Sequence, residues 1–470
     1  MIVMKFGGTS VAGAGPMRKV GGIVRRFAAK RPIVVVSALA GVTDDLLAAG
    51  RAAAAGRHAM ALRRAAALEA RHAESAAGLG LAPAVAARLA RECAAEFAEL
   101  REVLHGMVLL REPGPRPLDL LASFGERLSA RLVAAHLASL GLSARYVDAR
   151  DAVLTDDAHG AANVEPGPTG RRLRARLGPL LRARVVPVVT GFIGRDAQGA
   201  TTTLGRSGSD YTAALVAEAL RARELWIWKE VDGVLTADPD LVPEARLVAR
   251  LSYAEAAEMS HFGAEVLHPK TMQPARRAGV PVRIKNTFRP QGAGTVIGRQ
   301  AGRRGGPLMV SCLDRMALVT IEGAGIFGQP GMVLRLLAPV AGAGTNIYMI
   351  SMSSSEYNIS FAVHGRDVAR TRHALERDFR ARGWLRDDVA RVTIEPDMAV
   401  VAVVGAGMKG QRGIAGRIFS ALGDRGVNVV AIAQGSSEYN ISIVVRRRDR
   451  RAAVRAIHAR LNRGGRRSGR

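Results

Sequence analysis

The first 300 residues alternate short apolar runs with longer amphipathic stretches. The runs Ile2–Phe6 and Pro32–Leu39 are rich in valine and isoleucine, and residues 16–30 between them have helical spacing. Further apolar runs, which we also expect to be strands, lie at residues 144–149, 185–194, 224–228 and 280–286. Such alternation predicts a mostly parallel sheet covered by helices.

Residues 51–118 interrupt this alternation. They are rich in alanine, arginine and glutamate, and helix-breaking residues are few before residue 112. This composition favours helices. We therefore expect a helical insertion at about residues 51–118 within the first domain.

The C-terminal third contains an internal repeat with an offset of 82 residues. A 41-residue segment that begins at Gly323 aligns without gaps with one that begins at Gly405, and 18 positions are identical. Each copy has the pattern strand, glycine-rich turn, helix, strand, SSEYN turn, strand and second helix, which indicates a ferredoxin-like unit. The glycine- and arginine-rich stretch before it is typical of a linker. We expect domains at residues 1–300, 308–390 and 391–463, followed by a disordered basic tail at 464–470.

Composition excludes several function classes. The net charge is +27, but the 61 arginines are spread along the chain, and aromatic residues make up only 4%. Base-stacking platforms are therefore scarce, and we expect no specific nucleic-acid partner. No apolar run approaches the roughly 20 residues of a membrane span, and the start of the chain lacks the pattern of a signal peptide. Since the two cysteines are distant and form no disulfide or zinc pattern, we expect a cytoplasmic protein without a membrane partner.

The first segment with chemical potential is KFGGTSV at residues 5–11, directly after the first predicted strand. Gly7 and Gly8 allow close approach of a ligand to the backbone N–H groups, and Lys5 supplies positive charge for phosphate oxygens. Because the lysine precedes the glycines, this is not a Walker A loop. Taken alone, the segment is also compatible with an ordinary tight turn.

The second segment, TTTLGRSGSDYTAAL at residues 201–215, is a loop of small residues that leads into a helix. Ser209 and Asp210 fall near the predicted helix N-terminus, where anions are favoured. Arg206 can bridge a phosphoryl group during its transfer. The alternative is an N-capping aspartate at an ordinary loop-to-helix junction.

Two further segments suit a nucleotide. In WKEVDGVLTADP (228–239), Asp232, Asp238 and free carbonyls can hold a ribose and adenine, although the same dipeptides occur in plain surface turns. In HFGAEVLHPKTM (261–272), Lys270 follows a proline at a helix start, from where its ammonium can reach phosphates. His261 and His268 have no third ligand nearby, so we expect no zinc site.

The sequence gives weaker indications of the part of the site that would hold the molecule receiving the phosphoryl group. Ser37 and Thr43 flank a predicted strand-to-helix turn, and Glu126 lies at a predicted helix start in SFGERLSARL. A lone glutamate in a first turn is usually a partner of the helix dipole. Its role depends on what surrounds it.

In this order along the chain, KFGGTSV, VSAL…VTD, GERLSA, GFIG…TTTLGRSGSDYTAA, VDGVLTADP, FGAEVLHPKT and the two SSEYNIS repeats resemble the aspartate kinase family. The resemblance implies an α/β protein with an amino-acid-kinase (carbamate-kinase-like) three-layer sandwich followed by two ferredoxin-like βαββαβ ACT modules. In that family one ACT module is inserted in the other. Residues 308–317 are therefore expected to be shared with the last module.

The resemblance also assigns roles to residues of this sequence. The implied catalytic residues are Lys5, Arg206 and Asp210. The implied aspartate pocket comprises Ser37, Thr43, Glu126, Phe192, Arg206 and Ser209. The implied nucleotide site comprises Lys5, Gly7, Gly8, Thr9, Ser10, Lys229, Val231, Asp232, Val234, Asp238 and Lys270. The implied effector site comprises Gly325, Gln329, Gly331, Asn346 and Ile347.

The implied reaction is phosphorylation of the β-carboxylate of L-aspartate by ATP with Mg²⁺, for which no dedicated metal-ligand set is expected in the chain. Feedback inhibition by lysine or threonine and a dimer or tetramer formed through the ACT modules are implied as well. Because few residues follow the second repeat, we expect a monofunctional enzyme rather than a fusion with homoserine dehydrogenase. The alternatives are another enzyme of the same fold, acting on glutamate, N-acetylglutamate, carbamate or UMP, and a non-catalytic amino-acid sensor.

Overall fold

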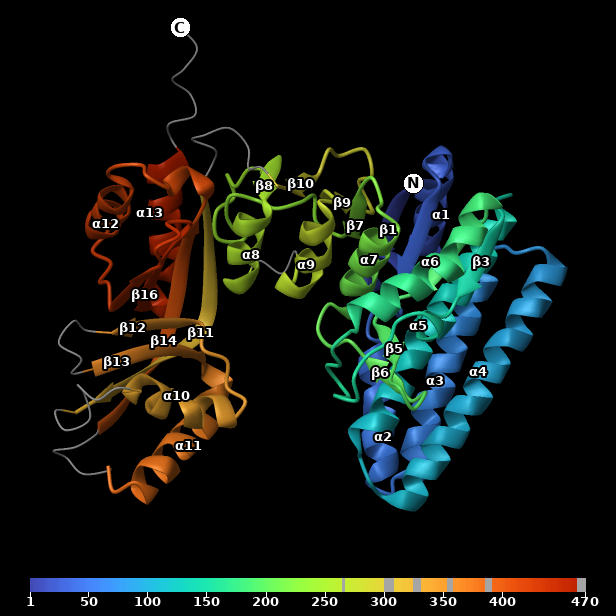
Figure 1. Cartoon of the computed structure of the whole chain (residues 1–470), viewed down its shortest axis with the longest axis horizontal. Coiled ribbons are helices and arrows are strands. Elements are labelled where there is room, and N and C mark those ends of the chain that lie inside the picture. Colours follow the sequence, from blue (N-terminus) through green and yellow to red (C-terminus); the bar gives the residue numbers. More distant parts are fainter. Residues whose placement is uncertain (264–266, 300–307, 324–330, 353–357, 385–390, 463–470) are drawn as a thin grey trace, which may run out of the picture. The chain divides into compact units, whose positions relative to one another are not determined.

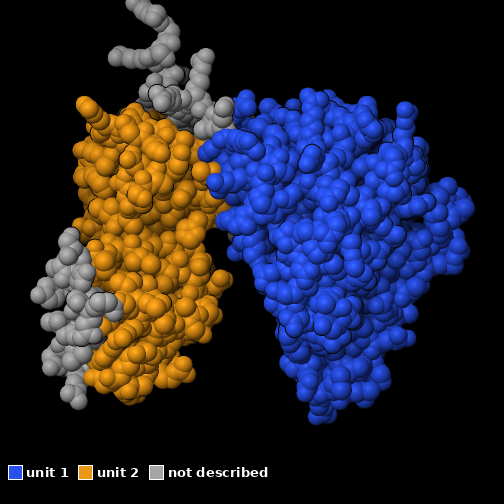
Figure 2. Space-filling model, viewed as in Figure 1, with its two compact units in different colours: residues 1–234, 249–253, 266–300 blue, residues 235–248, 254–265, 301–470 orange. Residues whose placement is uncertain are grey.

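The computed structural model describes residues 1–263, 267–299, 308–323, 331–352, 358–384 and 391–462 (Figure 1). The chain divides into two compact units (Figure 2). Unit 1 is residues 1–234, 249–253 and 266–300, and unit 2 is residues 235–248, 254–265 and 301–470. The expected tail at 464–470 lies outside the described residues. Within the described ranges, no helix is long and apolar enough to cross a membrane.

The units do not divide at residue 300 alone. Residues 235–248 and 254–265 group with unit 2, although they precede the expected boundary. The reason is packing, because Ala237 and Val242 are buried in the same apolar cluster as Val310 of unit 2.

Unit 1 contains an eight-stranded sheet with the order β3-β4-β2-β1-β7-β9-β10-β8. All neighbouring pairs are parallel except β9 and β10. The predicted, mostly parallel sheet is thus confirmed, and its central strands are buried on both faces as such sheets require. The strands are β1 (Ile2–Phe6), β2 (Pro32–Val36), β3 (Ala144–Val147), β4 (Val186–Thr190), β7 (Leu225–Lys229), β8 (Arg250–Ser252), β9 (Val282–Asn286) and β10 (Thr295–Gly298). A separate hairpin joins β5 (Ile193–Arg195) and β6 (Thr201–Thr203).

Two groups of helices cover this sheet and make the arrangement three-layered. In one group α5 contacts α1, α2 and α4 as well as β2, β3 and β4, and in the other α7 contacts α6 and α9 as well as β1, β2 and β7. The helices are α1 (Ala14–Arg26), α2 (Val42–Ala54), α3 (His58–Ala77), α4 (Pro83–Leu110), α5 (Pro115–Ser139), α6 (Pro166–Arg182), α7 (Gly208–Ala219), and α9 (Pro269–Ala278).

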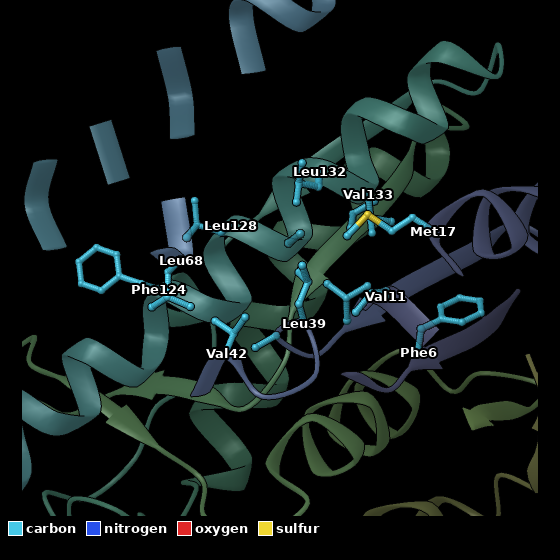
Figure 3. Packing of buried hydrophobic residues seen from close by; sticks show 14 of the residues in the cluster. Phe6, Val11, Met17, Leu39, Val42, Leu68, Phe124, Leu128, Leu132 and Val133 are labelled. Carbon is cyan, nitrogen blue, oxygen red and sulfur yellow. The ribbon is translucent and has the colours of Figure 1, made fainter. Parts of the chain in front are cut away.

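The long helices α3 and α4 lie where the sequence favoured a helical insertion, and α5 begins at the end of that stretch. Their apolar faces belong to the main core of unit 1, in which Leu68 of α3 lies in one cluster with Phe124 and Leu128 of α5 (Figure 3). The same cluster reaches Val11 and Leu39, which follow β1 and β2. The insertion therefore supports the segments that leave the C-terminal ends of these two strands.

Unit 2 contains a six-stranded antiparallel sheet with the order β12-β13-β11-β14-β16-β15. Its strands are β11 (Met309–Glu322), β12 (Met349–Met352), β13 (Asn358–His364), β14 (Arg391–Val404), β15 (Ala431–Gln434) and β16 (Asn440–Arg446). Its helices are α8 (Tyr253–His261), which begins in unit 1, α10 (Met332–Gly342), α11 (Val368–Ala381), α12 (Ile414–Gly423) and α13 (Arg450–Asn462). Two separate apolar clusters, one for each repeat, fill the space between sheet and helices.

The two repeats share their long central strands. The first part of β11, Met309–Leu313, pairs with Val400–Val404 at the end of β14, whereas the rest of β11 pairs with β13. Register shifts divide the strands, and the left-handed residues Arg315 and Asp397 (φ 56° for both) stand 82 positions apart. The backbone irregularity thus recurs with the offset of the sequence repeat.

Candidate functional site

Two lysines meet one aspartate at the C-terminal ends of two central strands of the sheet of unit 1. Lys5 lies near the end of β1 and Lys229 at the end of β7, and these parallel strands are neighbours. Asp210 comes from the first turn of α7. Its Oδ1 lies 2.6 Å from Nζ of Lys5, and its Oδ2 lies 3.9 Å from Nζ of Lys229.

This group is withdrawn from water. Asp210 is 2% and Lys5 6% exposed, so their charges attract one another in a medium of low dielectric constant. The Oδ1 atom is paired with the ammonium group of Lys5, which can rotate to direct an N–H at it. An aspartate in the first turn of a helix is also favoured by the helix dipole. The arrangement fixes two ammonium groups near one point at the C-terminal ends of β1 and β7.

The glycine segment runs directly beside these lysines. The N–H of Gly7 donates to the carbonyl of Trp228 (3.3 Å), and the N–H of Ala40 donates to the carbonyl of Gly8 (3.2 Å). A Cβ on Gly8 would lie 3.0 Å from the oxygen of Ala38, so a larger residue would push the two strand ends apart. The glycine is therefore required for the close approach of the segments after β1 and β2.

Thr9 and Ser10 are held from the other side. The hydroxyl of Thr9 donates to Oε2 of Glu230 (2.7 Å), and the hydroxyls of Ser10 and Thr287 lie 2.7 Å apart. The segment between Lys5 and Ser10 is thus attached to the ends of β7 and β9.

Glu126 lies in the middle of α5 rather than at a helix start, and its neighbourhood differs from that of a helix-dipole partner. It is 3% exposed, and Oε1 accepts a hydrogen bond from the N–H of Ala38 (3.1 Å). Burial raises the pKa of Glu126 to about 8, while the Ala38 N–H and the charge of Lys5 act in the opposite direction. Its Oε2 has no hydrogen-bond partner among the described residues. A buried carboxyl group with a vacant oxygen is suited to a cationic ligand.

The loops before α7 are tightly shaped. Phe192 (φ 68°) and Ser207 (φ 59°) adopt the left-handed conformation, which costs roughly 1–2 kcal/mol for a residue with a side chain. A Cβ on Gly208 would lie 2.7 Å from the ring of Phe192, and one on Gly191 would lie 2.5 Å from Cβ of Ser209. The turn after β4 and the start of α7 therefore fit closely together. Backbone strain of this kind concentrates at functional sites.

Ser37 and Thr43 are half-buried, at the end of β2 and in the first turn of α2. The N–H of Ser37 donates to the carbonyl of Phe6 (3.1 Å), which ties this turn to β1.

The predicted nucleotide side consists of residues that follow β7. Val231 is 40% exposed, and the N–H of the buried Val234 donates to the hydroxyl of Thr295 (2.9 Å). The carboxylate of Asp232 accepts from Nδ2 of Asn286 (2.8 Å) and pairs with Arg289 (2.9 Å). Asp232 is thus oriented by protein contacts of its own.

The charges of Lys270, Arg206 and Asp210 act on His268. Burial lowers the pKa of His268, and the charges of Arg206 and Lys270 act in the same direction, whereas that of Asp210 opposes them. The ring Nδ1 accepts from the N–H of Lys270 (3.2 Å), so His268 caps α9. Among the described residues there is no cluster of three or more potential metal ligands.

Three expected site residues are not among the described residues of unit 1. Asp238 belongs to unit 2, where its Oδ1 accepts from the N–H of Asp240 (2.9 Å). Gly325 and Gln329 fall outside the described residues.

Asp119 is a residue that the sequence did not reveal. It is buried on α5, and it accepts hydrogen bonds from the loop around Gly160 and from Thr203 of β6. Since these partners are distant in sequence, no local motif could have indicated it.

The model of the amino acid kinase family matches residues 1–286, and that of the ACT domain matches residues 319–379 and 401–461. The chloroplastic aspartokinase 2 of Arabidopsis thaliana is 33% identical over 97% of this chain and 83% of its own length. The chain belongs to the aspartokinase family.

Other relatives of the family are longer. The chloroplastic bifunctional aspartokinase/homoserine dehydrogenase 1 of A. thaliana is 34% identical over 98% of this chain, but the chain spans only 51% of that protein. Among solved structures, E. coli aspartokinase III in complex with aspartate and ADP is similar at a TM-score of 0.82, with 28% identity over 98% of this chain and 100% of that one. The same enzyme in complex with lysine and aspartate is similar at a TM-score of 0.80.

The remaining expected effector residues of this chain lie in the first repeat of unit 2. Gly331 is the left-handed N-cap of α10 (φ 81°), and Asn346 and Ile347 precede β12. Asn346 is exposed, whereas Ile347 packs against the apolar cluster of its repeat.

Proposed function

We propose that this chain transfers the γ-phosphoryl group of ATP to the β-carboxylate of L-aspartate. The observation that carries the proposal is the buried pair of Lys5 and Asp210, with Lys229 near the same carboxylate, beside a close-packed glycine segment. The similar E. coli enzyme holds aspartate and ADP, which supports these two ligand classes.

The chemistry requires charge neutralisation rather than proton transfer. A β-carboxylate with a reference pKa near 3.9 is already ionised at neutral pH, so no general base is needed. The difficulty is that an anion attacks an anionic phosphoryl group. Lys5 and Lys229 offset that repulsion, Asp210 holds their ammonium groups in place, and the glycines Gly7 and Gly8 let phosphate oxygens come close to the backbone.

Two oppositely charged groups recognise the substrate. Glu126 binds the ammonium of aspartate through its vacant Oε2, and Arg206 binds a substrate carboxylate. The half-buried Ser37 and Thr43, together with Phe192 and Ser209, line the rest of the pocket.

ATP is held on the side of β7. Lys270 and the segment Thr9–Ser10 contact its phosphates, while Val231, Asp232 and Val234 contact the ribose and base. Because no cluster of three acidic or other metal-ligating residues occurs in the described ranges, Mg²⁺ is held mainly by the phosphates and water, as is usual for this ion.

Regulation and assembly complete the proposal. Lysine or threonine inhibits the enzyme at the first ACT repeat, through Gly325, Gln329, Gly331, Asn346 and Ile347. The similar E. coli enzyme binds lysine, which supports an amino-acid effector. The protein is a cytoplasmic dimer or tetramer.

A coupled assay of ADP release tests the reaction. With ATP, Mg²⁺ and L-aspartate the wild-type protein is expected to release ADP, and with glutamate, N-acetylglutamate, carbamate or UMP it is expected to do so much more slowly or not at all. Lys5→Met is expected to lower kcat by at least about 100-fold, because it removes charge stabilisation from the transition state. Lys285→Met is the matched control, since Lys285 is another buried lysine of the same sheet that donates to the carbonyl of Gly292.

The control is expected to lower the melting temperature while kcat stays within about three-fold. If Lys5→Met retained the wild-type kcat, the role of Lys5 would be refuted. A wild-type protein that binds lysine or threonine but releases no ADP with any of these acceptors would instead be a non-catalytic sensor.

A further inference from the structure

The carboxylate of Asp119 joins three segments of unit 1 at one point. Asp119 is 3% exposed. It accepts hydrogen bonds from Nδ1 of His159 (2.9 Å), from the N–H of Gly160 (3.0 Å), and from both the N–H (3.1 Å) and the hydroxyl (2.5 Å) of Thr203. Four donors from a loop and a strand thus converge on one carboxylate of helix α5.

These bonds fix the start of the loop that carries Arg206. Thr203 is the last residue of β6, and the next N–H, that of Leu204, donates to the carbonyl of Phe192 (2.9 Å). Gly205 follows in the left-handed conformation (φ 73°), and a Cβ built on it would lie 3.2 Å from Cβ of Ala161. The turn that Asp119 holds at Gly160 is therefore also the surface on which the Arg206 loop rests.

The same helix carries Glu126. Seven residues separate Asp119 from Glu126, which places both on one face of α5, about 10 Å apart along the axis. A helix buried along most of this length is a rigid spacer. Asp119 therefore connects the position of the Arg206 loop to that of Glu126.

We propose that Asp119 is a positioning residue that sets the spacing between Glu126 and Arg206, and thereby the length of the amino acid that the site accepts. The inference rests on the proposed function, in which Glu126 binds the substrate ammonium and Arg206 a substrate carboxylate. A dicarboxylic amino acid with one more methylene group than aspartate fits only if this spacing changes.

An ordinary buried carboxylate of the same hairpin behaves differently. Asp196 is 6% exposed, and its Oδ1 accepts from the N–H of Ala200 (2.7 Å) within the turn between β5 and β6. That contact closes the turn at the end of the hairpin opposite to Thr203. Asp196 is therefore a matched control for loosening of the hairpin without loss of the connection to α5.

Asp119→Asn is the decisive variant. Asparagine keeps one acceptor oxygen and replaces the other with a donor, so at least one of the bonds to Gly160 and Thr203 is lost. A displacement of about 1 Å at a reacting group costs on the order of 100-fold in rate. We expect KM for L-aspartate to rise at least about ten-fold and the preference for L-aspartate over L-glutamate in kcat/KM to fall at least about ten-fold. KM for ATP is expected to stay within about two-fold.

Controls separate positioning from stability. Asp196→Asn is expected to leave KM for aspartate within about two-fold. Thr203→Val removes the hydroxyl donor and is expected to reproduce part of the Asp119→Asn effect. Thr203→Ser keeps the hydroxyl and is expected to have the wild-type KM for aspartate. The Thr203 pair also decides the question if Asp119→Asn does not fold.

Two results would overturn the inference. One is an unchanged KM and unchanged acceptor preference in Asp119→Asn and Thr203→Val. The other is an equal rise of KM for aspartate and for ATP that matches the loss of melting temperature, which indicates a general structural role. Failure of the proposed function is distinct, because the wild-type protein itself would then release no ADP with aspartate.

Discussion

At the scale of single residues, Glu126 shows how burial and function are connected. Its carboxyl group is enclosed by α5 and the turn after β2, and the pKa of about 8 means that the free protein holds it protonated at neutral pH. A substrate ammonium beside Oε2 would favour the ionised form. If Glu126 binds the substrate ammonium as proposed, binding of aspartate at pH 7 is coupled to release of a proton.

Replacement of Glu126 tests its raised pKa through the pH dependence of stability. The folded protein binds a proton with a pKa of about 8, whereas the ordinary value for the group is 4.5, so the folded state holds more protons between these two pH values. The free energy of unfolding must then fall as pH rises from about 4.5 to about 8. Relative to Glu126→Gln, we expect wild-type stability to decline by at most a few kcal/mol over this window, at up to about 1.4 kcal/mol per pH unit. Urea unfolding at pH 5 to 9 measures the difference.

The control for this prediction is an exposed glutamate ahead of the same helix. Glu112→Gln is expected to leave the pH dependence of wild-type stability unchanged, because Glu112 is exposed. If wild type and Glu126→Gln had parallel stability profiles across the whole range, the raised pKa of Glu126 would be excluded.

Residues differ in how far the sequence can predict them. Lys5, Arg206 and Asp210 stand in short segments whose composition already indicates phosphate chemistry. Asp119 stands in an unremarkable helical stretch, and its significance depends on Gly160 and Thr203, which only the fold brings near. A carboxylate that acts through distant partners leaves no local pattern.

At the scale of elements, helix α8 connects parts that are far apart in the sequence. Within unit 2, Oε1 of the buried Glu255 accepts from the N–H of Ala406 (2.7 Å), at the start of the glycine loop of the second repeat. At the other end of the helix, Nε2 of His261 lies 3.2 Å from the carbonyl of Tyr348 in the first repeat. One helix therefore contacts both repeats.

Loss of the Glu255 carboxylate should loosen the glycine loop of the second repeat. In Glu255→Ala the N–H of Ala406 loses its acceptor, which costs about 1–3 kcal/mol for a buried donor. We expect faster hydrogen exchange of residues 405–413, measured by mass spectrometry. Glu258→Ala on the same helix is the control, since Glu258 is only half-buried. In this variant the hydrogen exchange of residues 405–413 is expected to equal that of wild type. Equal exchange in both variants would show that α8 does not hold the loop.

Elements with a strong apolar pattern were predicted well. The predicted strand Ile2–Phe6 coincides with β1, and the run at 280–286 contains β9. The three-residue strand β8 and the short β10 were not predicted, because so few residues have no measurable period. The grouping of residues 235–248 with unit 2 was also missed, since it depends on burial of Ala237 and Val242 against another segment.

At the scale of the whole molecule, neither of the two repeats forms its apolar core from its own residues alone. The strand at Met309–Val310 precedes the first repeat in the sequence, but Val310 lies in the apolar cluster of the second repeat, together with Val401 and Ile418. Each core therefore contains residues from outside its own repeat. A change in one repeat can reach the other through the continuous strands β11 and β14.

The repeat also provides a matched test of where an effector acts. Asn346 in the first repeat corresponds to Asn428 in the second, 82 positions later, and both side chains are exposed. If the effector binds only the first repeat, Asn346→Ala should raise the concentration of lysine or threonine needed for half-inhibition at least about ten-fold. This corresponds to loss of about 1.4 kcal/mol of binding free energy, which is ordinary for one hydrogen bond to a charged ligand.

Asn428→Ala should leave inhibition as in wild type, and neither variant should change kcat without effector. Activity titrated with each amino acid measures both quantities. Equal shifts in the two variants would mean that both repeats bind the effector, because the repeat makes their sites equivalent. Wild-type activity that responds to neither amino acid would assign the repeats to assembly alone, since the shared strands β11 and β14 then serve only to join them.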